Sequence, residues 1–240
     1  MNTQSGNEPI AFICAMPIEL APLVRLLSLA EIEVNGTMMH TGTLDGREVV
    51  AIVTGMGTKL ATEATARLLD AVAVRWVLVV GITGALESET PIGALVLPEV
   101  VVNSETGSEH RPTQLGDGVP HGTMWTTNGL TTNLDDLAQL RAQGVVSLDM
   151  ETAAIAECCE SRGIPWSVFR VISDRANDGT VDEEVFHLSN QDGTPNPAAI
   201  EKYVAEHPER LPLLAQMAEN AALATRTAAE AAIRACAYIA

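Results

Sequence analysis

Three observations on this chain predict an α/β fold. Apolar runs of the length of buried strands alternate with helix-like segments along the 240 residues. Asp45-Gly46 joins two such runs as a two-residue hairpin, so those two strands are expected to be antiparallel. Hydrophobic residues make up 47% of the chain, which excludes disorder and suffices for one sizeable core. We therefore expect a single domain over residues 9–240 after a disordered tail over residues 1–8.

A net charge of −17 limits the partners of the chain. This charge repels a nucleic-acid backbone and an anionic membrane, and it favours a neutral or cationic small molecule as the ligand. The longest apolar runs are too short to cross a bilayer, and residues 1–8 lack the pattern of a signal peptide. We therefore expect a cytoplasmic protein without membrane insertion. The four cysteines show no metal-ligand spacing, so we expect no metal site.

The chain begins with a predicted strand over residues 9–15 and a helix from Pro17 to about Leu29. Proline suits an early helical position because its missing N–H would have no partner there. Glu19 falls in the first turn, where the helix dipole favours a negative charge. Ordinary charge pairing at a helix start is the alternative to a functional role for Glu19.

A hairpin and a glycine-containing turn follow. Residues 37–44 and 47–54 are the two strands of the hairpin. The turn Gly55-Met56-Gly57 leads into a predicted helix over about residues 60–72. It lacks the third glycine of a dinucleotide fingerprint and the Gly-Lys-Ser/Thr of a P-loop, so neither motif is present.

The middle of the chain carries a second glycine motif and a long polar segment. Residues 76–80 predict a buried strand that ends in Gly81-Ile82-Thr83-Gly84, where the backbone can approach a ligand closely. Residues 94–102 predict another strand. Residues 103–125 predict a polar loop, and a loop of this length is either functional or disordered.

The stretch from residue 145 to residue 174 places acids directly after two apolar runs. Residues 145–148 and 166–172 predict two buried strands joined by an Ala-rich helix. The first is followed by Asp149-Met150-Glu151 and the second by Ser173-Asp174. Ligands of open parallel sheets bind outside the carboxyl ends of the strands, so these acids are candidates for chemistry. The alternative is that they only cap helices and pair with nearby arginines.

The last third of the chain predicts a loop followed by helices. Residues 175–197 are rich in Gly, Asp, Asn and Pro, and their carboxylates have no metal-site spacing, so a solvated loop is expected. Residues 198–240 are helical with breaks near Pro208 and Pro212. Their many alanines indicate close packing against the sheet or against a second subunit.

Five motifs follow one another in order between about residues 10 and 235: Ala15-Met-Pro-Ile-Glu19, Thr54-Gly-Met-Gly-Thr-Lys59, Gly81-Ile-Thr-Gly84, Asp149-Met-Glu151 and Arg170-Val-Ile-Ser-Asp174. In this order they resemble the purine nucleoside phosphorylase and methylthioadenosine (S-adenosylhomocysteine) nucleosidase superfamily. The resemblance implies a three-layer α/β/α fold with a central mixed, partly closed β-sheet. It also implies a catalytic domain that cleaves the N-glycosidic bond of a nucleoside. We expect no organic cofactor, and we expect a homo-oligomer.

The resemblance assigns roles by position. Asp174 resembles the general acid that gives a proton to N7 of a purine, and Ser173 lies beside the base. Glu19 resembles the acid that positions the attacking water, and Arg170 resembles an arginine near that water. Met150 and Glu151 match residues that pack under the ribose and hold its hydroxyls. The expected substrate-binding set is completed by Asp149, Ile82, Thr83 and Gly84.

The charges of the reaction agree with these roles. Departure of the base builds positive charge on the sugar and negative charge on the purine. A protonated acid is therefore needed on one side of the bond, and anions or dipoles are needed on the other. Asp174 must then have a raised pKa, whereas Glu19 must stay ionised.

Departures from the family pattern leave open whether the chain resembles the nucleosidases or the phosphorylases of the superfamily more closely. Methylthioadenosine nucleosidases carry serine where this chain has Ile82, and their longer middle section places an aromatic residue over the sugar. Hexameric phosphorylases hold phosphate with a Gly-Asp-Pro-x-Arg turn, which is replaced here by Cys14-Ala-Met-Pro-Ile18. Asp192-Gly-Thr-Pro-Asn-Pro197 resembles the hopanoid-associated phosphorylase-like subgroup, whose proposed substrate is an adenosylated lipid. We expect hydrolysis of a purine nucleoside or related adenosyl compound, with phosphorolysis or a catalytically silent nucleoside-binding protein as alternatives.

Overall fold

The computed structural model describes residues 8–34, 36–176 and 178–240. The tail expected over residues 1–8 lies outside this part of the chain except for Glu8. The strands are β1 (Ile10–Cys14), β2 (Ala30–Val34), β3 (Thr37–Leu44), β4 (Arg47–Val53), β5 (Trp76–Ala85), β6 (Leu95–Val96), β7 (Val100–Asn103), β8 (Glu109–His110), β9 (Thr123–Thr126), β10 (Val145–Asp149) and β11 (Trp166–Arg175). The α-helices are α1 (Pro17–Leu27), α2 (Thr58–Ala71), α3 (Leu134–Ala142), α4 (Thr152–Glu160), α5 (Glu183–Phe186), α6 (Pro197–Glu206) and α7 (Leu211–Ala235).

The strands form one sheet that branches at β5. Its path runs β2-β3-β4-β1-β5-β10-β9-β7-β8, and β5 also pairs with β11, which pairs with β6. The sheet is mixed, as expected, because β1 and β11 run parallel to β5 whereas β10 runs antiparallel to it. No pairing among the described strands joins β2 to β8. The sheet is therefore open and branched, and the expected partial closure is not found.

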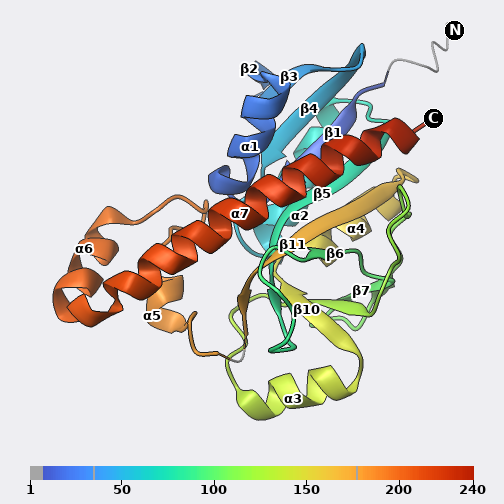
Figure 1. The fold of residues 1–240 in the computed structure, drawn as a ribbon. Coiled ribbons are helices and arrows are strands. Elements are labelled where there is room, and N and C mark those ends of the chain that lie inside the picture. Colours follow the sequence, from blue (N-terminus) through green and yellow to red (C-terminus); the bar gives the residue numbers. More distant parts are fainter. Residues whose placement is uncertain (1–7, 35, 177) are drawn as a thin grey trace, which may run out of the picture.

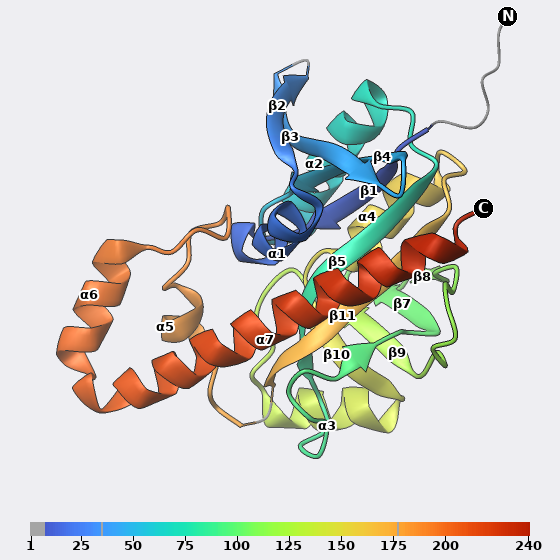
Figure 2. The ribbon, with the colours of Figure 1, turned by 45° about the horizontal axis from the view of Figure 1, so that its top comes forward.

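Helices cover both faces of this sheet and give the three predicted layers. α2 and α4 lie on one face, and α1 and α7 lie on the other (Figures 1 and 2). Successive side chains of a strand point to opposite faces. Ile13 of β1 accordingly packs in the core of α2 and α4, whereas Phe12 packs in the core of α1 and α7.

Pairing between distant strands changes three of the predicted elements. The strand expected over residues 76–80 continues to Ala85, because the glycine motif pairs with β11 instead of forming a turn. The strand expected over residues 94–102 splits into β6 and β7 around Pro98, which has no N–H to donate to a ladder. The loop expected over residues 103–125 contains β8 and the start of β9. These short strands depend on long-range partners, so their local sequence carries little signal.

The C-terminal third combines a helix on the sheet with an arm beside it. The second half of α7 packs its alanines against β5 and β11, with Ala224, Ala228 and Ala232 fully buried. Packing on the sheet is one of the two alternatives that the alanine content of this segment indicated. Residues 197–223, which comprise α6 and the first half of α7, extend beyond the sheet and are called the arm below (Figures 1 and 2).

Candidate active site

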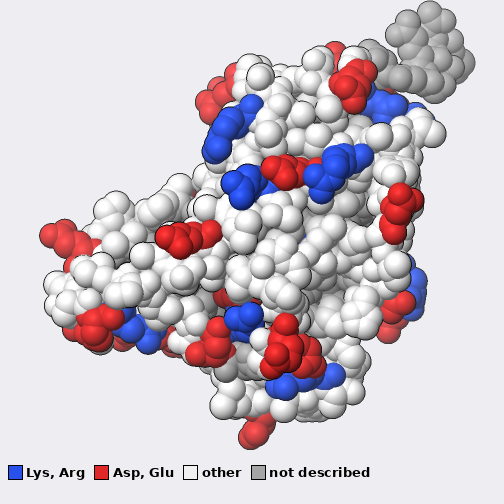
Figure 3. All heavy atoms as spheres, viewed as in Figure 1, with Lys and Arg blue, Asp and Glu red and all other residues white. Residues whose placement is uncertain are grey.

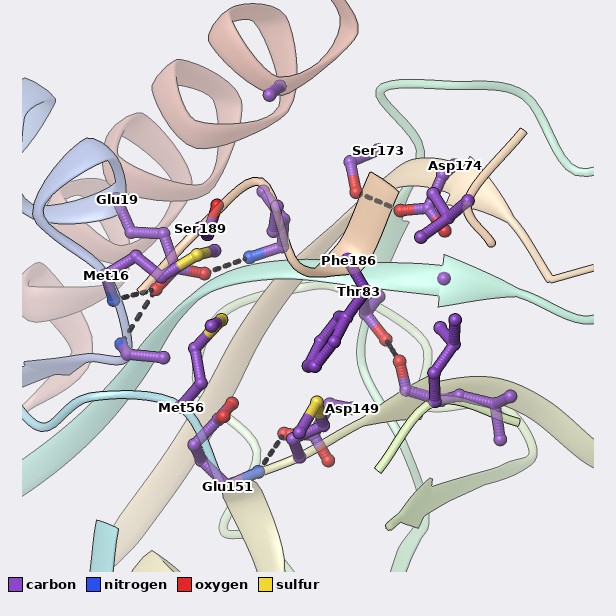
Figure 4. A pocket seen from close by; sticks show the side chains of 18 of the residues that line it. Met16, Glu19, Met56, Thr83, Asp149, Glu151, Ser173, Asp174, Phe186 and Ser189 are labelled. Carbon is purple, nitrogen blue, oxygen red and sulfur yellow. Dashed lines mark hydrogen bonds between the residues drawn. The ribbon is translucent and has the colours of Figure 1, made fainter. Parts of the chain in front are cut away.

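All ten residues singled out in the sequence line one cavity of about 270 Å³. The cavity lies where the first turn of α1 meets the second half of β5 and the ends of β10 and β11 (Figure 4). β10 and β11 reach Gly84 of β5 from opposite directions, and Leu148 and Asp174 pair with it there. The acids therefore meet at the middle of a mixed sheet. The sequence had suggested instead that they meet at one edge where parallel strands end together.

Arg170 is the centre of a buried charge cluster. Its Nη1 lies 3.3 Å from Oε1 of Glu19, and its Nη2 lies 3.0 Å from Oδ2 of Asp149 and 3.1 Å from Oε2 of Glu151. The side chain is 2% exposed. Burial by itself would lower the pKa of Arg170, but the three carboxylates raise it above the ordinary value, so the guanidinium is charged. One cation thus binds three acids from three different elements.

Glu19 is fixed by backbone N–H groups around it. One carboxylate oxygen accepts hydrogen bonds from the backbone of Ala15 at 2.7 Å and Met16 at 2.9 Å, which caps the start of α1. The other oxygen accepts from the backbone N–H of Ile82 at 2.8 Å and from Arg170. Burial raises the pKa of Glu19, while Arg170 and these N–H groups lower it, and the net shift is upward. Glu19 can therefore take up a proton more readily than an exposed glutamate.

Asp149 joins three elements around the arginine. Oδ1 accepts a hydrogen bond of 2.6 Å from Oγ1 of Thr126 on β9. Oδ2 accepts bonds of 2.8 Å from the backbone and 2.5 Å from the hydroxyl of Thr152 at the start of α4, in addition to Arg170. The side chain is 1% exposed. Asp149 lines the cavity, but these partners hold its carboxylate in place for Arg170 and α4.

Glu151 bridges the cluster to the turn before α2. Its Oε1 accepts a hydrogen bond of 2.8 Å from the backbone N–H of Gly57, and its Oε2 accepts from Arg170. Burial raises the pKa of Glu151 to about 7; Arg170 opposes this shift and Asp149 adds to it. The protonation of Glu151 therefore changes near neutral pH.

Asp174 lies away from this cluster, on the side of the cavity that Figure 4 shows with Ser173. The hydroxyl of Ser173 donates a hydrogen bond of 2.5 Å to Oδ1 of Asp174. A register shift between Ile172 and Asp174 marks a bulge that redirects the end of β11. Burial raises the pKa of Asp174, partly offset by the bond from Ser173. A carboxyl group in this position favours the protonated form that a general acid needs.

The glycine motif contributes mainly through its backbone. The backbone N–H of Ile82 donates a hydrogen bond to Glu19, and the carbonyl of Ile82 accepts one of 3.0 Å from Arg170. The hydroxyl of Thr83 donates a bond of 2.6 Å to the carbonyl of Leu148 and so ties β5 to β10. At Gly84, a Cβ would lie 3.1 Å from Oδ2 of Asp174. The absent side chain leaves that carboxyl group accessible.

Eleven further residues line the cavity. Two of them, Ala15 and Leu148, are backbone neighbours of the site, and the other nine were not identified from the sequence: Met16, Met56, Leu130, Val181, Val185, Phe186, Ser189, Met217 and Ala221. Four of them lie in residues 175–197, which contain α5 and are therefore not simply a solvated loop. The available signal was the set of apolar residues Val181, Val185 and Phe186 in an otherwise polar segment. Met217 and Ala221 come from the arm, which no local pattern could place over the cavity.

Other kinds of site have little support in the described residues. No group of three His, Cys, Asp or Glu side chains there has an arrangement that could hold a metal ion. No helix in the same part of the chain is both long and apolar enough to span a membrane. On the face that Figure 3 shows, basic side chains lie among acidic ones and form no broad basic patch.

Comparison of the sequence with known proteins agrees with the geometry. The profile of the phosphorylase superfamily matches residues 9–121 and 109–206. A 5′-methylthioadenosine/S-adenosylhomocysteine nucleosidase of Colwellia psychrerythraea is 30% identical over 200 residues, which cover 68% of this chain and 82% of that protein. A nucleosidase of the same name from Oceanobacillus iheyensis is 25% identical over 197 residues, covering 70% and 86%.

Solved structures share the fold. The nucleosidase of S. pneumoniae with a transition-state inhibitor has a TM-score of 0.72 at 22% identity, covering 97% of this chain and 100% of that one. Futalosine hydrolase of Helicobacter pylori has a TM-score of 0.70 at 18% identity, covering 93% and 94%. The five ordered motifs, the branched three-layer fold and the profile match lead to one conclusion: this chain belongs to the phosphorylase superfamily.

Proposed function

We propose that this protein hydrolyses the N-glycosidic bond of a purine nucleoside, with 5′-substituted adenosines as the first compounds to test. The observation that carries this proposal is the separation of two kinds of acid in one cavity. Asp174 has a raised pKa and, among the residues that the structure describes, no arginine partner, whereas Glu19, Asp149 and Glu151 surround Arg170. Such a division suits a reaction in which the base gains negative charge and the sugar gains positive charge.

Asp174 acts on the base in this mechanism. In its protonated form it donates to N7 of the purine as the bond breaks, which neutralises the charge that the base acquires. Ser173 holds Oδ1, so Oδ2 is the oxygen that faces the ligand beside Gly84. The accessible carboxyl group beside a glycine backbone leaves room for a flat ring.

The charge cluster acts on the sugar and the nucleophile. Glu151 accepts hydrogen bonds from the ribose hydroxyls, and Met150 packs under the ring. Glu19, held in place by Arg170, orients a water molecule toward the carbon from which the base departs and accepts its proton. The negative charge of the cluster stabilises the cationic sugar in the transition state, because it is fixed in advance in a buried site.

Water fits this cavity better than phosphate does. The lining residues include four carboxylates, and Arg170 is the lining residue with a positive charge in the described part of the chain. Its donors are already bound to Glu19, Asp149 and Glu151. A phosphate ion would therefore meet repulsion without a free arginine to hold it.

The test is release of the base in phosphate-free buffer. Purified protein is incubated with adenosine, inosine and 5′-methylthioadenosine, and free base and sugar are quantified by chromatography. Hydrolysis yields the free base and a sugar with a free anomeric hydroxyl. A requirement for added phosphate together with a sugar 1-phosphate product would assign phosphorolysis instead. Binding of these nucleosides without release of base would indicate a nucleoside-binding protein.

A further inference from the structure

The loop between α5 and α6 contains a sequence motif that has no role in the proposed mechanism. This motif is Asp192-Gly-Thr-Pro-Asn-Pro197. Ser189 and Pro195 pair as an isolated bridge, so residues 189–195 form a closed loop. In Figures 1 and 2 the chain between α5 and α6 turns back toward α1. The 189–195 loop therefore lies close to the charge cluster, although none of the proposed steps uses it.

Hydrogen bonds inside the 189–195 loop fix its shape. The backbone N–H of Asn190 donates to the carbonyl of Thr194 at 2.8 Å, and that of Gly193 donates to the carbonyl of Asn190 at 2.9 Å. Asp192 accepts a bond of 2.9 Å from the N–H of Thr194 and one of 2.6 Å from its hydroxyl. Because these bonds join neighbouring residues, a shift of one residue moves the others with it.

Gly193 packs directly against the residue that precedes α1. A Cβ at Gly193 would lie 2.7 Å from Cβ and 3.0 Å from Cα of Met16. These two atoms of Met16 cannot rotate out of the way, because the backbone fixes their position. The N–H of Met16 donates the 2.9 Å hydrogen bond to Glu19. The close contact that glycine permits here therefore locates one of the donors to Glu19.

The same loop contacts the turn before α2. The carbonyl of Gln191 accepts a hydrogen bond of 2.8 Å from the backbone N–H of Met56. The next residue, Gly57, donates the 2.8 Å bond to Glu151. A Cβ at Gly55 would lie 3.1 Å from the carbonyl oxygen of Gln191, so loop and turn touch there as well. The loop thus contacts two backbone turns that supply N–H groups to the acids of the cluster.

We propose that the 189–195 loop is a positioning element of the charge cluster, with Gly193 as its positioning residue. It holds in place one N–H donor of Glu19 and one N–H donor of Glu151. The inference rests on the proposed function for its effect on turnover. The contacts of the loop with the two turns do not depend on that function.

The charge of both acids depends on these donors. Burial raises the pKa of Glu19 and of Glu151, whereas Arg170 and backbone N–H groups lower it, among them those of Met16 for Glu19 and of Gly57 for Glu151. A hydrogen bond donated to a carboxylate favours its ionised form. Loss of either donor would therefore raise the pKa of its acid, and both acids act as carboxylates in the proposed mechanism.

Other titratable groups also face the two acids. Arg170, Glu151 and Cys14 face Glu19, and Arg170, Asp149 and Glu19 face Glu151. None of these groups lies in residues 189–195. A change confined to the loop therefore acts on the two acids through the N–H donors.

Gly193→Ala tests the inference. Its Cβ overlaps Met16, and the overlap is relieved by moving either Met16 or the loop. The first movement weakens the bond from Met16 to Glu19, and the second draws the loop away from the turn that holds Glu151. In either case one acid is protonated at a higher pH. We expect the acidic limb of the pH profile of kcat/KM to move up by about one pH unit, since bonds to charged groups are strong.

Gly179→Ala is the matched control. Gly179 has the left-handed backbone of Gly193, with a φ of 68° against 76°, so alanine meets similar backbone strain at both positions. A Cβ at Gly179 meets nothing within 4 Å. We expect the acidic limb of this control to match that of the wild-type protein. The profiles are measured with the nucleoside that the wild-type protein cleaves fastest.

Two further measurements cover poor folding and absence of turnover. Thr194→Val removes the hydroxyl that bonds to Asp192 and to Asn190 without adding an overlap, so it should move the limb in the same direction by a smaller amount. Hydrogen exchange followed by mass spectrometry should show faster exchange in peptides covering residues 15–20 or 54–60 of Gly193→Ala. Exchange in the other strands should stay at the wild-type rate.

Three results would overturn the inference. One is a folded Gly193→Ala protein with the wild-type acidic limb and wild-type exchange. Another is an equal shift in Gly179→Ala. The third is a lower melting temperature with an unchanged acidic limb, which indicates a purely structural contact. If the wild-type protein releases no base, the proposed function fails, and the exchange rates alone decide whether the loop holds the two turns.

Discussion

Gly81→Ala tests whether the packing of the charge cluster determines activity. Gly81 of β5 pairs with Arg170 of β11, and Glu19 lies against its backbone. A Cβ at this position would overlap the Glu19 carboxylate and would lie 2.7 Å from Nη1 of Arg170. The smallest possible side chain therefore cannot be added without moving one of the two charged groups.

The expected loss of activity in Gly81→Ala follows from the contacts that Glu19 would lose. Displacing Glu19 breaks its 3.3 Å ion pair with Arg170 and its 2.8 Å hydrogen bond from Ile82. Breaking a buried pair costs about 3–5 kcal/mol, and we expect the lower end because Arg170 keeps two other carboxylates. If that loss applies to the transition state, kcat/KM falls by roughly 100-fold.

The assay is base release, together with urea unfolding to separate loss of stability from loss of activity. Gly129→Ala is the control, because a Cβ at Gly129 meets nothing within 4 Å. We expect this control to retain stability and activity. Unchanged kcat/KM in folded Gly81→Ala would refute the assignment of Glu19 and Arg170 to the reaction.

The remaining predictions address individual groups. Asp174→Asn removes the transferable proton and should lower the rate by about 10²-fold or more, whereas a native rate would contradict the general-acid role. Glu151→Gln should reduce the preference for ribonucleosides over 2′-deoxynucleosides, since bonds to a charged acceptor are worth about 1.5–3 kcal/mol; equal wild-type rates on both would argue against this role. Glu19→Gln should slow base release strongly in phosphate-free buffer. Burial raises the pKa of Glu151 in the folded protein from the ordinary value of 4.5 to about 7, so this group contributes stability that is present below pH 4.5 and is lost as pH rises through 7. Thermal melts between pH 5 and 8 should show this loss, and Glu151→Gln should reduce it.

The sequence predicted those parts of the site that lie next to their own secondary-structure elements. Glu19 follows the proline that starts α1, and Asp149, Glu151 and Asp174 follow apolar runs that form strands. Their positions depend on local patterns, which a single sequence displays. Their roles in turnover remain predictions, because location in a common cavity does not show which group transfers a proton.

The parts that the sequence could not predict depend on contacts across the fold. The glycine motif looks like a turn, but pairing with β11 keeps it extended within β5. β10 runs antiparallel to β5, and no local feature of residues 145–149 specifies that direction. The second half of α7 packs on the sheet, and this packing places the first half of the helix so that Met217 lines the cavity. In each case a tertiary partner determines the outcome.

The charge cluster depends on contacts between elements that are far apart in the sequence, and its charge suits cleavage of the bond to the base. Three carboxylates around one guanidinium have a net charge of −2 when all are ionised, in a site that water scarcely reaches. Such an excess is costly in a buried site, and burial is the main cause of the raised pKa values of Glu19 and Glu151, to which the neighbouring Asp149 adds for Glu151. A cationic sugar would relieve the excess, because it brings positive charge to the site at the moment when the bond to the base breaks. Asp149, held by Thr126 and Thr152, forms the third ion pair of Arg170. If the proposed function is correct, the cluster interacts more favourably with the cationic sugar of the transition state than with the neutral substrate, which is the condition for an interaction to accelerate a reaction.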